Sequence, residues 1–312
     1  RNRAIDMGLK VNEYGVFDIS DIEDPDSGQR VGERVAGETE EGVYEALDMA
    51  WMPPEIRENR GEVAAAASGE LPELLTTEDV RGDLHLHTEY SDGETTIEAM
   101  ADAAADFGHE YISVADHATG PGMVGGVGLT DEELREQIEA IRSVDADHDI
   151  DVFAGVEANI GEDGSVSVGE DVLAELDCVV ASPHSGLDGD GTDRIVAAIE
   201  HPEVDIIGHP TGRLLNQRPG LDLDVERVAE SAADNGTALE INADPHRLDL
   251  RSSNVKVAIE AGATIAIDTD AHRPGAYESI RYGVHTARRG WAEADDVLNT
   301  RDADGVREFL GL

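Results

Sequence analysis

The sequence predicts an α/β protein in which a parallel barrel of alternating strands and helices follows a small α+β subdomain. Three observations predict this architecture. From residue 83 onward, short apolar runs alternate with amphipathic segments, and there are seven apolar runs. No GxGxxG sequence follows the first run, which weighs against an open, doubly wound sheet that binds a dinucleotide. Residues 1–60 lack the alternation and are expected to fold separately.

The seven predicted strands are rich in Val, Ile and Leu, as is typical of strands buried on both faces of a parallel sheet. They cover residues 83–88, 111–117, 151–160, 178–184, 205–210, 238–243 and 264–272. Segments with helical character lie between them, at residues 95–108, 129–144, 193–200, 224–236 and 254–262. Thr130 and Glu133 have the spacing of a capping box, and Gly108, Gly236 and Gly262 are placed to end three helices.

The residues before the barrel predict a smaller unit and a connection. GLKVNEYGVFDI (8–19) is typical of a strand or hairpin arm, and ETEEGVYEALDM (38–49) is typical of a short amphipathic helix. Residues 61–80 are low in complexity, which predicts a linker between residues 1–60 and a barrel domain of residues 81–312. The alanine run in this stretch is also compatible with a short helix.

The chain is strongly acidic. It carries 69 Asp and Glu against 23 Lys and Arg, a formal net charge of −46, and its lysines are Lys10 and Lys256 alone. The acidic residues are spread over every segment, which favours a surface adapted to high salt, in a halophilic archaeon, over an acidic partner-binding tail. Because concentrated salt screens repulsion between charges, the net charge does not exclude binding to nucleic acid.

Three further features limit the classes of function. Cys178 is the only cysteine, which excludes a disulfide framework and a thiolate metal cluster. No apolar stretch is long enough to span a membrane and no signal peptide is seen near Arg1, so we expect a cytoplasmic protein without a membrane partner. The chain begins with Arg1 instead of Met, which suggests a fragment of a longer chain.

Residues with metal-binding side chains gather where the predicted strands end. His85 and His87 stand two apart on one face of the first strand, and His, Asp or Glu residues follow at the ends of other strands. The carboxyl ends of the strands form the active-site end of a parallel barrel. The sequence therefore predicts a metal centre there, from a candidate set that comprises His85, His87, Asp92, Asp116, His117, Glu157, His184, His209, Asp270 and His272.

Several nearby residues are expected to play other roles. Asp116 is placed to cap or orient its strand end, and Asp268 to support another, with Asp270 the better ligand. The remaining barrel histidines that we interpret as ordinary core or surface residues are His109, His148, His201 and His285.

The candidate ligands are too many for one ion. A zinc ion takes about four ligands, of which about three come from protein at a catalytic site. The set therefore suits two or three ions that share a bridging carboxylate. Imidazole and carboxylate ligands without thiolate fit zinc or manganese, with iron as a further candidate. Clustered divalent ions are typical of phosphoester hydrolysis, in which they hold phosphate oxygens and activate a water molecule.

Three arginines that follow strand ends are candidates for phosphate binding. Arg213 follows His209, Arg247 follows the sixth strand, and Arg273 follows His272. Each is also readily interpreted as a salt-bridging surface arginine on such an acidic chain. Arg213 and Arg247 are the stronger candidates for a catalytic role on the substrate.

Taken in order, HLHTEYSDG, ADH, GVE, SPH, GHP and DTDAH resemble the motifs of the PHP (polymerase and histidinol phosphatase) superfamily, across residues 81–312. The resemblance implies a distorted (β/α)7 barrel with a trinuclear metal centre, in which Glu157 is the bridging carboxylate. The metal ligands that it implies are His85, His87, Asp92, His117, Glu157, His184, His209, Asp270 and His272. No ligand position is missing, which weighs against a degenerate, structural PHP domain.

The leader before the barrel indicates one branch of that superfamily. GLKVNEYGVFD with RVAGETEEGVYEALDMAWMPPEIRE resembles the thumb of a bacterial or archaeal family X DNA polymerase, in which a thumb precedes a PHP domain. EINADPHRLDL (240–250) is similar to the same branch. The resemblance implies a thumb-like subdomain at residues 1–60. The polymerase palm would lie before residue 1, so we expect no templated polymerisation from these residues alone and an upstream polymerase domain if the chain is a fragment.

The resemblance implies a metal-dependent phosphoesterase that acts on DNA 3′ ends in DNA repair, as a 3′–5′ exonuclease and 3′-phosphatase. Two alternatives stay open. One is a phosphatase of the histidinol-phosphate type that takes a small phosphomonoester as its substrate. The other is a non-enzymatic module that scaffolds DNA or a polymerase.

Overall fold

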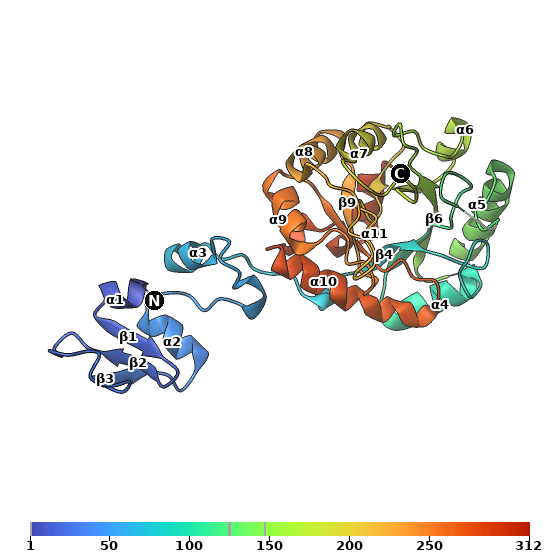
Figure 1. The fold of residues 1–312 in the computed structure, drawn as a ribbon. Coiled ribbons are helices and arrows are strands. Elements are labelled where there is room, and N and C mark those ends of the chain that lie inside the picture. Colours follow the sequence, from blue (N-terminus) through green and yellow to red (C-terminus); the bar gives the residue numbers. More distant parts are fainter. Residues whose placement is uncertain (1, 124–125, 147) are drawn as a thin grey trace. The chain divides into compact units, whose positions relative to one another are not determined.

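The computed structural model describes residues 2–123, 126–146 and 148–312, and the chain divides into two compact units, Arg1–Pro72 and Glu73–Leu312 (Figure 1). The division falls inside the stretch for which the sequence predicts a linker. The alanine run in that stretch forms helix α3 (Glu62–Ser68), in agreement with the alternative interpretation. The predicted domain limits at residues 60 and 80 stay predictions.

The first unit contains a three-stranded antiparallel sheet and short helices. The strands are β1 (Leu9–Asn12), β2 (Gly15–Asp18) and β3 (Glu33–Ala36), in the order β1-β2-β3. β1 and β2 pair as a hairpin within residues 8–19, for which a strand or hairpin arm was expected, whereas β3 was not predicted. Helix α1 (Asn2–Asp6) precedes the sheet, and α2 (Glu40–Ala46) confirms the helix expected over residues 38–49. The unit has a small core of Ala4, Leu9, Val16 and Ala36.

The second unit confirms the predicted parallel barrel. Its seven strands lie in the order β10-β9-β8-β7-β6-β5-β4, and every pairing is parallel. The backbone N–H of His87 donates to the carbonyl of Ala271 at 2.8 Å, which joins the end of β4 to the segment after β10. The strands are β4 (Gly82–Leu86), β5 (Tyr111–Val114), β6 (Asp151–Asn159), β7 (Cys178–Ser182), β8 (Ile206–Ile207), β9 (Ala238–Asn242) and β10 (Ile265–Asp268).

Helices surround the strands (Figure 1). They are α4 (Ile97–Phe107), α5 (Asp131–Asp145), α6 (Glu170–Leu173), α7 (Thr192–Ile199), α8 (Val225–Asn235), α9 (Ser252–Glu260) and α10 (Ile280–Arg289). Thr130 and Glu133 form the predicted capping box of α5, and Gly108 and Gly236 end α4 and α8 in the left-handed conformation. Met100 of α4 and Ile112 of β5 lie in one fully buried apolar cluster, which shows how helix and strand pack.

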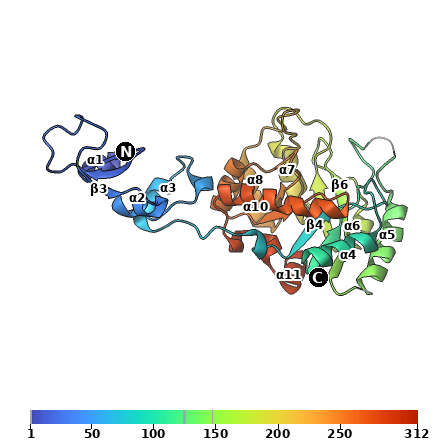
Figure 2. The same cartoon turned by 90° about the horizontal axis from the view of Figure 1, so that it is seen from below.

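One end of the barrel is closed by helix α11 (Ala303–Leu310), which was not predicted. Val306 of α11 shares an apolar cluster with Leu84, Tyr111 and Phe153, residues of β4, β5 and β6. Figure 2 shows α11 at the end of the barrel away from the long loops that follow β7 and β8. Among the described residues, no helix has both the length and the apolarity to cross a membrane, and the cytoplasmic location stays a prediction.

Candidate metal centre

The predicted ligands converge at the carboxyl ends of the barrel strands. His85 lies on β4 and His87 directly after it, Glu157 lies near the end of β6, and the other predicted ligands lie in the loops after β4, β5, β7, β8 and β10. Most of them are buried: His85 and His87 are 0% exposed, Glu157 and His209 1%. Two of them, His209 and Asp270, have positive backbone φ angles of 25° and 54°. This conformation is uncommon in residues other than glycine, and where it occurs it is often found at functional sites.

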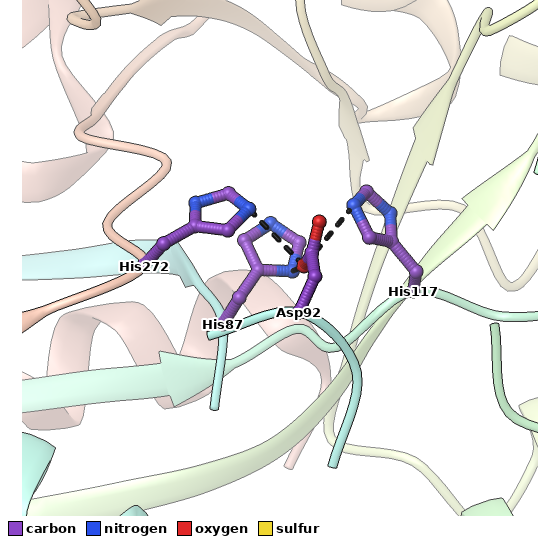
Figure 3. A group of neighbouring side chains, drawn as sticks. All are labelled: His87, Asp92, His117 and His272. Atoms are coloured by element: carbon purple, nitrogen blue, oxygen red, sulfur yellow. Dashed lines mark ion pairs between the residues drawn. The ribbon is translucent and has the colours of Figure 1, made fainter. Parts of the chain in front are cut away.

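Four side chains form one group with a shared focus. His87, Asp92, His117 and His272 place one donor atom each within 4.8 Å of one another. Figure 3 shows Asp92 between the imidazoles of His117 and His272, whose Nε2 atoms are 3.6 and 3.2 Å from its Oδ1. This is the arrangement expected of ligands around a cation.

Glu157 lies at the centre of the remaining histidines. Its Oε2 is 2.5 Å from Nδ1 of His117, and its Oε1 is 3.3 Å from Nε2 of His184 and 2.9 Å from Nε2 of His209. On the β4 side, Oε1 is also 3.4 Å from Nε2 of His85. Its two oxygens face different imidazoles, Oε2 that of His117 and Oε1 those of His85, His184 and His209, which is the position that a bridging carboxylate requires.

Two further groups of donors adjoin the first. His117, Glu157 and His184 form one, and His85, His87 and Asp270 form the other, with 3.0 Å between His87 Nε2 and Asp270 Oδ1. His87 and His117 each take part in two groups. Shared ligands place the three groups side by side, so the cluster has room for more than one ion.

Electrostatics keep the carboxylates of the cluster ionised. Burial would raise the pKa of Glu157, but the neighbouring His184, His117 and His85 hold it well below its usual value. Burial likewise opposes ionisation of Asp270, whose pKa is nevertheless lowered by the hydrogen bond with His87. Burial, together with the charge of His117, lowers the pKa of His87 to about 3. Ionised carboxylates and neutral imidazoles bind metal ions, so His87 is in the binding state, whereas His117, in which burial lowers the pKa but the charge of Glu157 raises it to about 10, would give up a proton to an ion.

Unpartnered polar atoms support a metal inside this cluster. Among the described residues, Nδ1 of His87, Nδ1 of His184 and Nδ1 of His209 are buried without a hydrogen-bond partner. Nε2 of His85, Nε2 of His87 and Nδ1 of His117 face only the carboxylates of Glu157 and Asp270. Buried polar groups are almost always satisfied, because leaving one without a partner destabilises the fold. The donors are imidazole and carboxylate only, a set that fits zinc, manganese or iron.

Sequence reasoning missed a second layer of polar residues on β9. Glu240 is fully buried; its carboxylate accepts from Nδ1–H of His85 at 2.6 Å and from the backbone N–H of His209 at 2.5 Å. Asn242, also on β9, donates to Asp270 at 3.0 Å. Such partners fix the orientation of metal-binding side chains. The available signal was a carboxylate in the middle of the apolar run ALEINA.

Asp116 makes contacts that suit the orienting role expected of it, and that role stays a prediction. Its carboxylate accepts from the backbone N–H and the hydroxyl of Thr88, at 2.8 and 2.6 Å, and also from Ser91 and Gln137. It belongs to none of the three donor groups among the described residues. These bonds hold the loop that carries Asp92. Asp268 likewise supports the strand ends, because it accepts from the backbone N–H of Leu84 at 2.7 Å.

The predicted arginines have different surroundings. Arg247 reaches the cluster, with its Nε 3.5 Å from Oδ2 of Asp270. The guanidinium of Arg213 donates to the backbone carbonyls of Arg247 and Leu248, so its contacts hold the loop that carries Arg247. Catalytic roles for Glu157, Arg213 and Arg247 stay predictions, as do the individual ligand assignments.

Each unit matches a known protein family. Residues 1–58 match the DNA polymerase beta thumb, and residues 83–244 match the PHP domain. The chain is 36% identical over 314 residues to the "DNA polymerase/3′-5′ exonuclease PolX" of Bacillus subtilis; the match covers 99% of this chain but 53% of that protein, so the chain spans about half its length.

Shorter relatives match the barrel unit. A "Probable phosphatase" of Thermoanaerobacter sp. (strain X514) is 32% identical over 247 residues, which cover 73% of this chain and 93% of that protein. Among solved structures, a zinc-containing histidinol phosphate phosphatase from Lactococcus lactis aligns with 17% identity and a TM-score of 0.47, over 67% of this chain and 93% of the other. The PHP match over more than half of the chain and the nearly full-length phosphatase relative together show that the chain belongs to the PHP family, with a DNA polymerase beta thumb segment ahead of its barrel.

Proposed function

We propose that this metal-dependent phosphoesterase of the PHP family acts on the 3′ ends of DNA, as a 3′–5′ exonuclease and 3′-phosphatase in DNA repair, within a family X DNA polymerase. The observation that carries the proposal is that one chain combines a polymerase-type thumb segment with a buried cluster of metal-binding side chains. A small-molecule phosphatase has no evident use for the thumb segment.

Different groups of side chains are expected to bind different ions. One ion would be held by His117, Glu157 and His184, a second by His85, His87 and Asp270, and a third by His87, Asp92, His117 and His272, and Glu157, which also contacts His85, would be the carboxylate shared between ions. His209 adds a donor beside Glu157. We expect two or three zinc or manganese ions, with iron as a further candidate. When bound, such ions neutralise phosphate oxygens and activate a water molecule.

The protein side chains around the ions orient the substrate. Arg247, beside Asp270, is placed to donate to a phosphate oxygen at the mouth of the cluster. Arg213 keeps that loop in position through the two backbone carbonyls that it binds. Glu240 holds the ring of His85 so that Nε2 faces the cluster.

The test uses the metal-loaded chain with 3′-recessed, gapped and 3′-phosphorylated oligonucleotides, at a salt concentration that keeps the protein folded. We expect manganese- or zinc-dependent release of nucleotides or phosphate, lost in His87→Ala and kept in His285→Ala. His285 is an exposed residue of α10 and provides a matched control. No metal-dependent cleavage in the wild type, or equal cleavage in His87→Ala, would refute the proposal.

A second candidate function is hydrolysis of small phosphomonoesters. It is favoured by the probable phosphatases, which resemble this chain over nearly their whole length. Activity on free phosphomonoesters with none on any oligonucleotide would support this candidate over the first.

A further inference from the structure

A cavity of about 330 Å³ lies beside the metal centre, between the loops after β8 and β9 and the start of α9. Its wall includes Thr211, Arg213, Gly220, Leu221, Arg251 and Asn254. Gly220 has a φ angle of +82°, and a Cβ atom there would approach the carbonyl oxygen of Thr211 to 2.5 Å. Glycine therefore lets this loop lie close against Thr211 and helps to form the wall.

The charged residues of the cavity wall are two arginines, Arg213 and Arg251, and two aspartates, the exposed Asp222 and the buried Asp249. Neither arginine forms an ion pair with a carboxylate in the part of the chain that the structure describes. Asn254, which is 8% exposed, accepts from Nε of Arg251 at 3.0 Å and so fixes the direction of that side chain. In a protein of net charge −46, two arginines on one wall that form no ion pair among the described residues, although Asp222 and Asp249 line the same cavity, indicate a site for an anion.

Asp249, the buried carboxylate on the cavity wall, is hydrogen-bonded to the loop after β8. Asp249 accepts from the backbone N–H and hydroxyl of Thr211 at 3.0 and 2.8 Å, and from the backbone N–H of Arg213 at 3.4 Å. Its charge is therefore used to hold the loop after β8. Nε and Nη2 of Arg213 donate to backbone carbonyls and Nε of Arg251 donates to Asn254, so among the described residues Nη1 of Arg213 and the two Nη groups of Arg251 have no hydrogen-bond acceptor.

The cavity adjoins the proposed catalytic end directly. Thr211 lies two residues after His209, and Gly212 N–H donates to the carbonyl of His209 at 2.7 Å. On the other side, Arg213 donates to the backbone of Arg247, whose side chain reaches Asp270 of the metal cluster. A chain molecule that places one phosphate at the ions can place a neighbouring phosphate in this cavity.

We propose that this cavity binds a second backbone phosphate of a polynucleotide, the one that neighbours the phosphate held at the metal centre. The inference rests on the proposed action on DNA 3′ ends and deepens it. A mononucleotide has no second phosphate to place there, so the cavity makes the site selective for polynucleotides. Leu221 offers an apolar surface for the adjoining sugar.

The test compares Arg251→Ala with Arg227→Ala, in the full chain at fixed salt. Arg227 is a partly exposed arginine of α8 that pairs with Asp193 and does not line the cavity, so its loss changes the net charge equally. Binding of a fluorescein-labelled oligonucleotide is measured by anisotropy, and hydrolysis is measured on a 3′-phosphorylated mononucleotide and on a 3′-phosphorylated trinucleotide.

We expect Arg251→Ala to weaken oligonucleotide binding and to lower kcat/KM on the trinucleotide by about tenfold, as for loss of one hydrogen bond to a charged group. Mononucleotide hydrolysis and the Arg227→Ala variant should match the wild type. Unchanged oligonucleotide binding in Arg251→Ala, or an equal loss in Arg227→Ala, would overturn the inference. Absence of hydrolysis of every substrate by the wild type would instead refute the proposed function, while the anisotropy comparison still decides whether the cavity binds phosphate.

Discussion

The two units of the chain use buried polar groups in opposite ways. Within residues 2–72 the only buried charged side chain is Glu62, and it is satisfied by the backbone N–H groups of Asn59 and Arg60 at 2.8 and 2.7 Å. The barrel instead buries a whole cluster of imidazoles and carboxylates, several without hydrogen-bond partners. The difference teaches that the barrel is organised around metal ions, whereas the first unit is organised around its own small core.

The largest effect is expected from Glu157→Ala. Because this carboxylate contacts the donors on both sides of the cluster, its loss should remove more than the roughly 10–100-fold in activity that outer residues contribute. The measurement is kcat/KM on a 3′-phosphorylated oligonucleotide, with metal content determined in parallel. Glu175→Gln, an exposed carboxylate paired with Arg135, serves as control. Activity of Glu157→Ala within tenfold of the wild type would show that Glu157 is not central.

Removal of the metal ions by a chelator should lower the Tm of the barrel but leave that of the first unit unchanged. An ion present at about one hundred times its Kd contributes about 2.7 kcal/mol, so its removal should lower the Tm of the barrel by about 5–10 °C. The two tryptophans report on the units separately, Trp51 in the first and Trp291 in the barrel. Fluorescence melting of Trp51→Phe should show the shift with EDTA, and Trp291→Phe should not. Equal shifts in both variants would contradict the contrast between the units.

Asp116→Asn should have a smaller effect than removal of a ligand. Asp116 holds Thr88 and Ser91 and so positions the loop of Asp92. We expect a loss of about 10–100-fold in activity, against a larger loss in His117→Ala, with both variants folded by circular dichroism. Comparable losses in the two variants would make Asp116 a ligand or an equal partner in the chemistry.

The smallest effect concerns a buried histidine away from the cluster. Burial lowers the pKa of His109 to about 4. In the unfolded chain the pKa of this histidine is about 6.5, so between pH 6.5 and 4 the unfolded state binds more protons than the folded state. The free energy of unfolding is therefore highest above pH 6.5 and decreases as the pH falls toward 4. Between pH 7.5 and 5, the wild type should lose about 2 kcal/mol more in free energy of unfolding than His109→Phe. Equal pH dependence in urea titrations would contradict this assignment.

Much of the barrel could be predicted because strands buried on both faces give continuous apolar runs. All seven strands were found in this way, and the ends of those runs also pointed to His117, Glu157 and Asp270. Helix α10 was not predicted because its buried face is narrow: Ile280, Val284 and Ala287 are separated by polar and charged residues. Strand β3 is only four residues long, and most of it is exposed.

The outer layer of the site could not be predicted for a different reason. Glu240 contacts a histidine 155 positions earlier in the chain, and Asn242 contacts Asp270 on the neighbouring strand segment. No sequence spacing encodes these contacts, because the first joins β9 to β4, which is not its neighbour in the sheet, and the second joins β9 to the segment after β10. The same holds for the cavity of Arg213 and Arg251, which exists only once the loops after β8 and β9 are folded together.

The central claim is that the barrel holds a multinuclear metal centre, and the most direct test is the metal content of the purified full chain. Elemental analysis after dialysis against metal-free buffer should give two or three ions of zinc, manganese or iron per chain, and fewer in Glu157→Ala. Fewer than two tightly bound ions per wild-type chain, or equal content in the variant, would contradict the account and favour a scaffolding module.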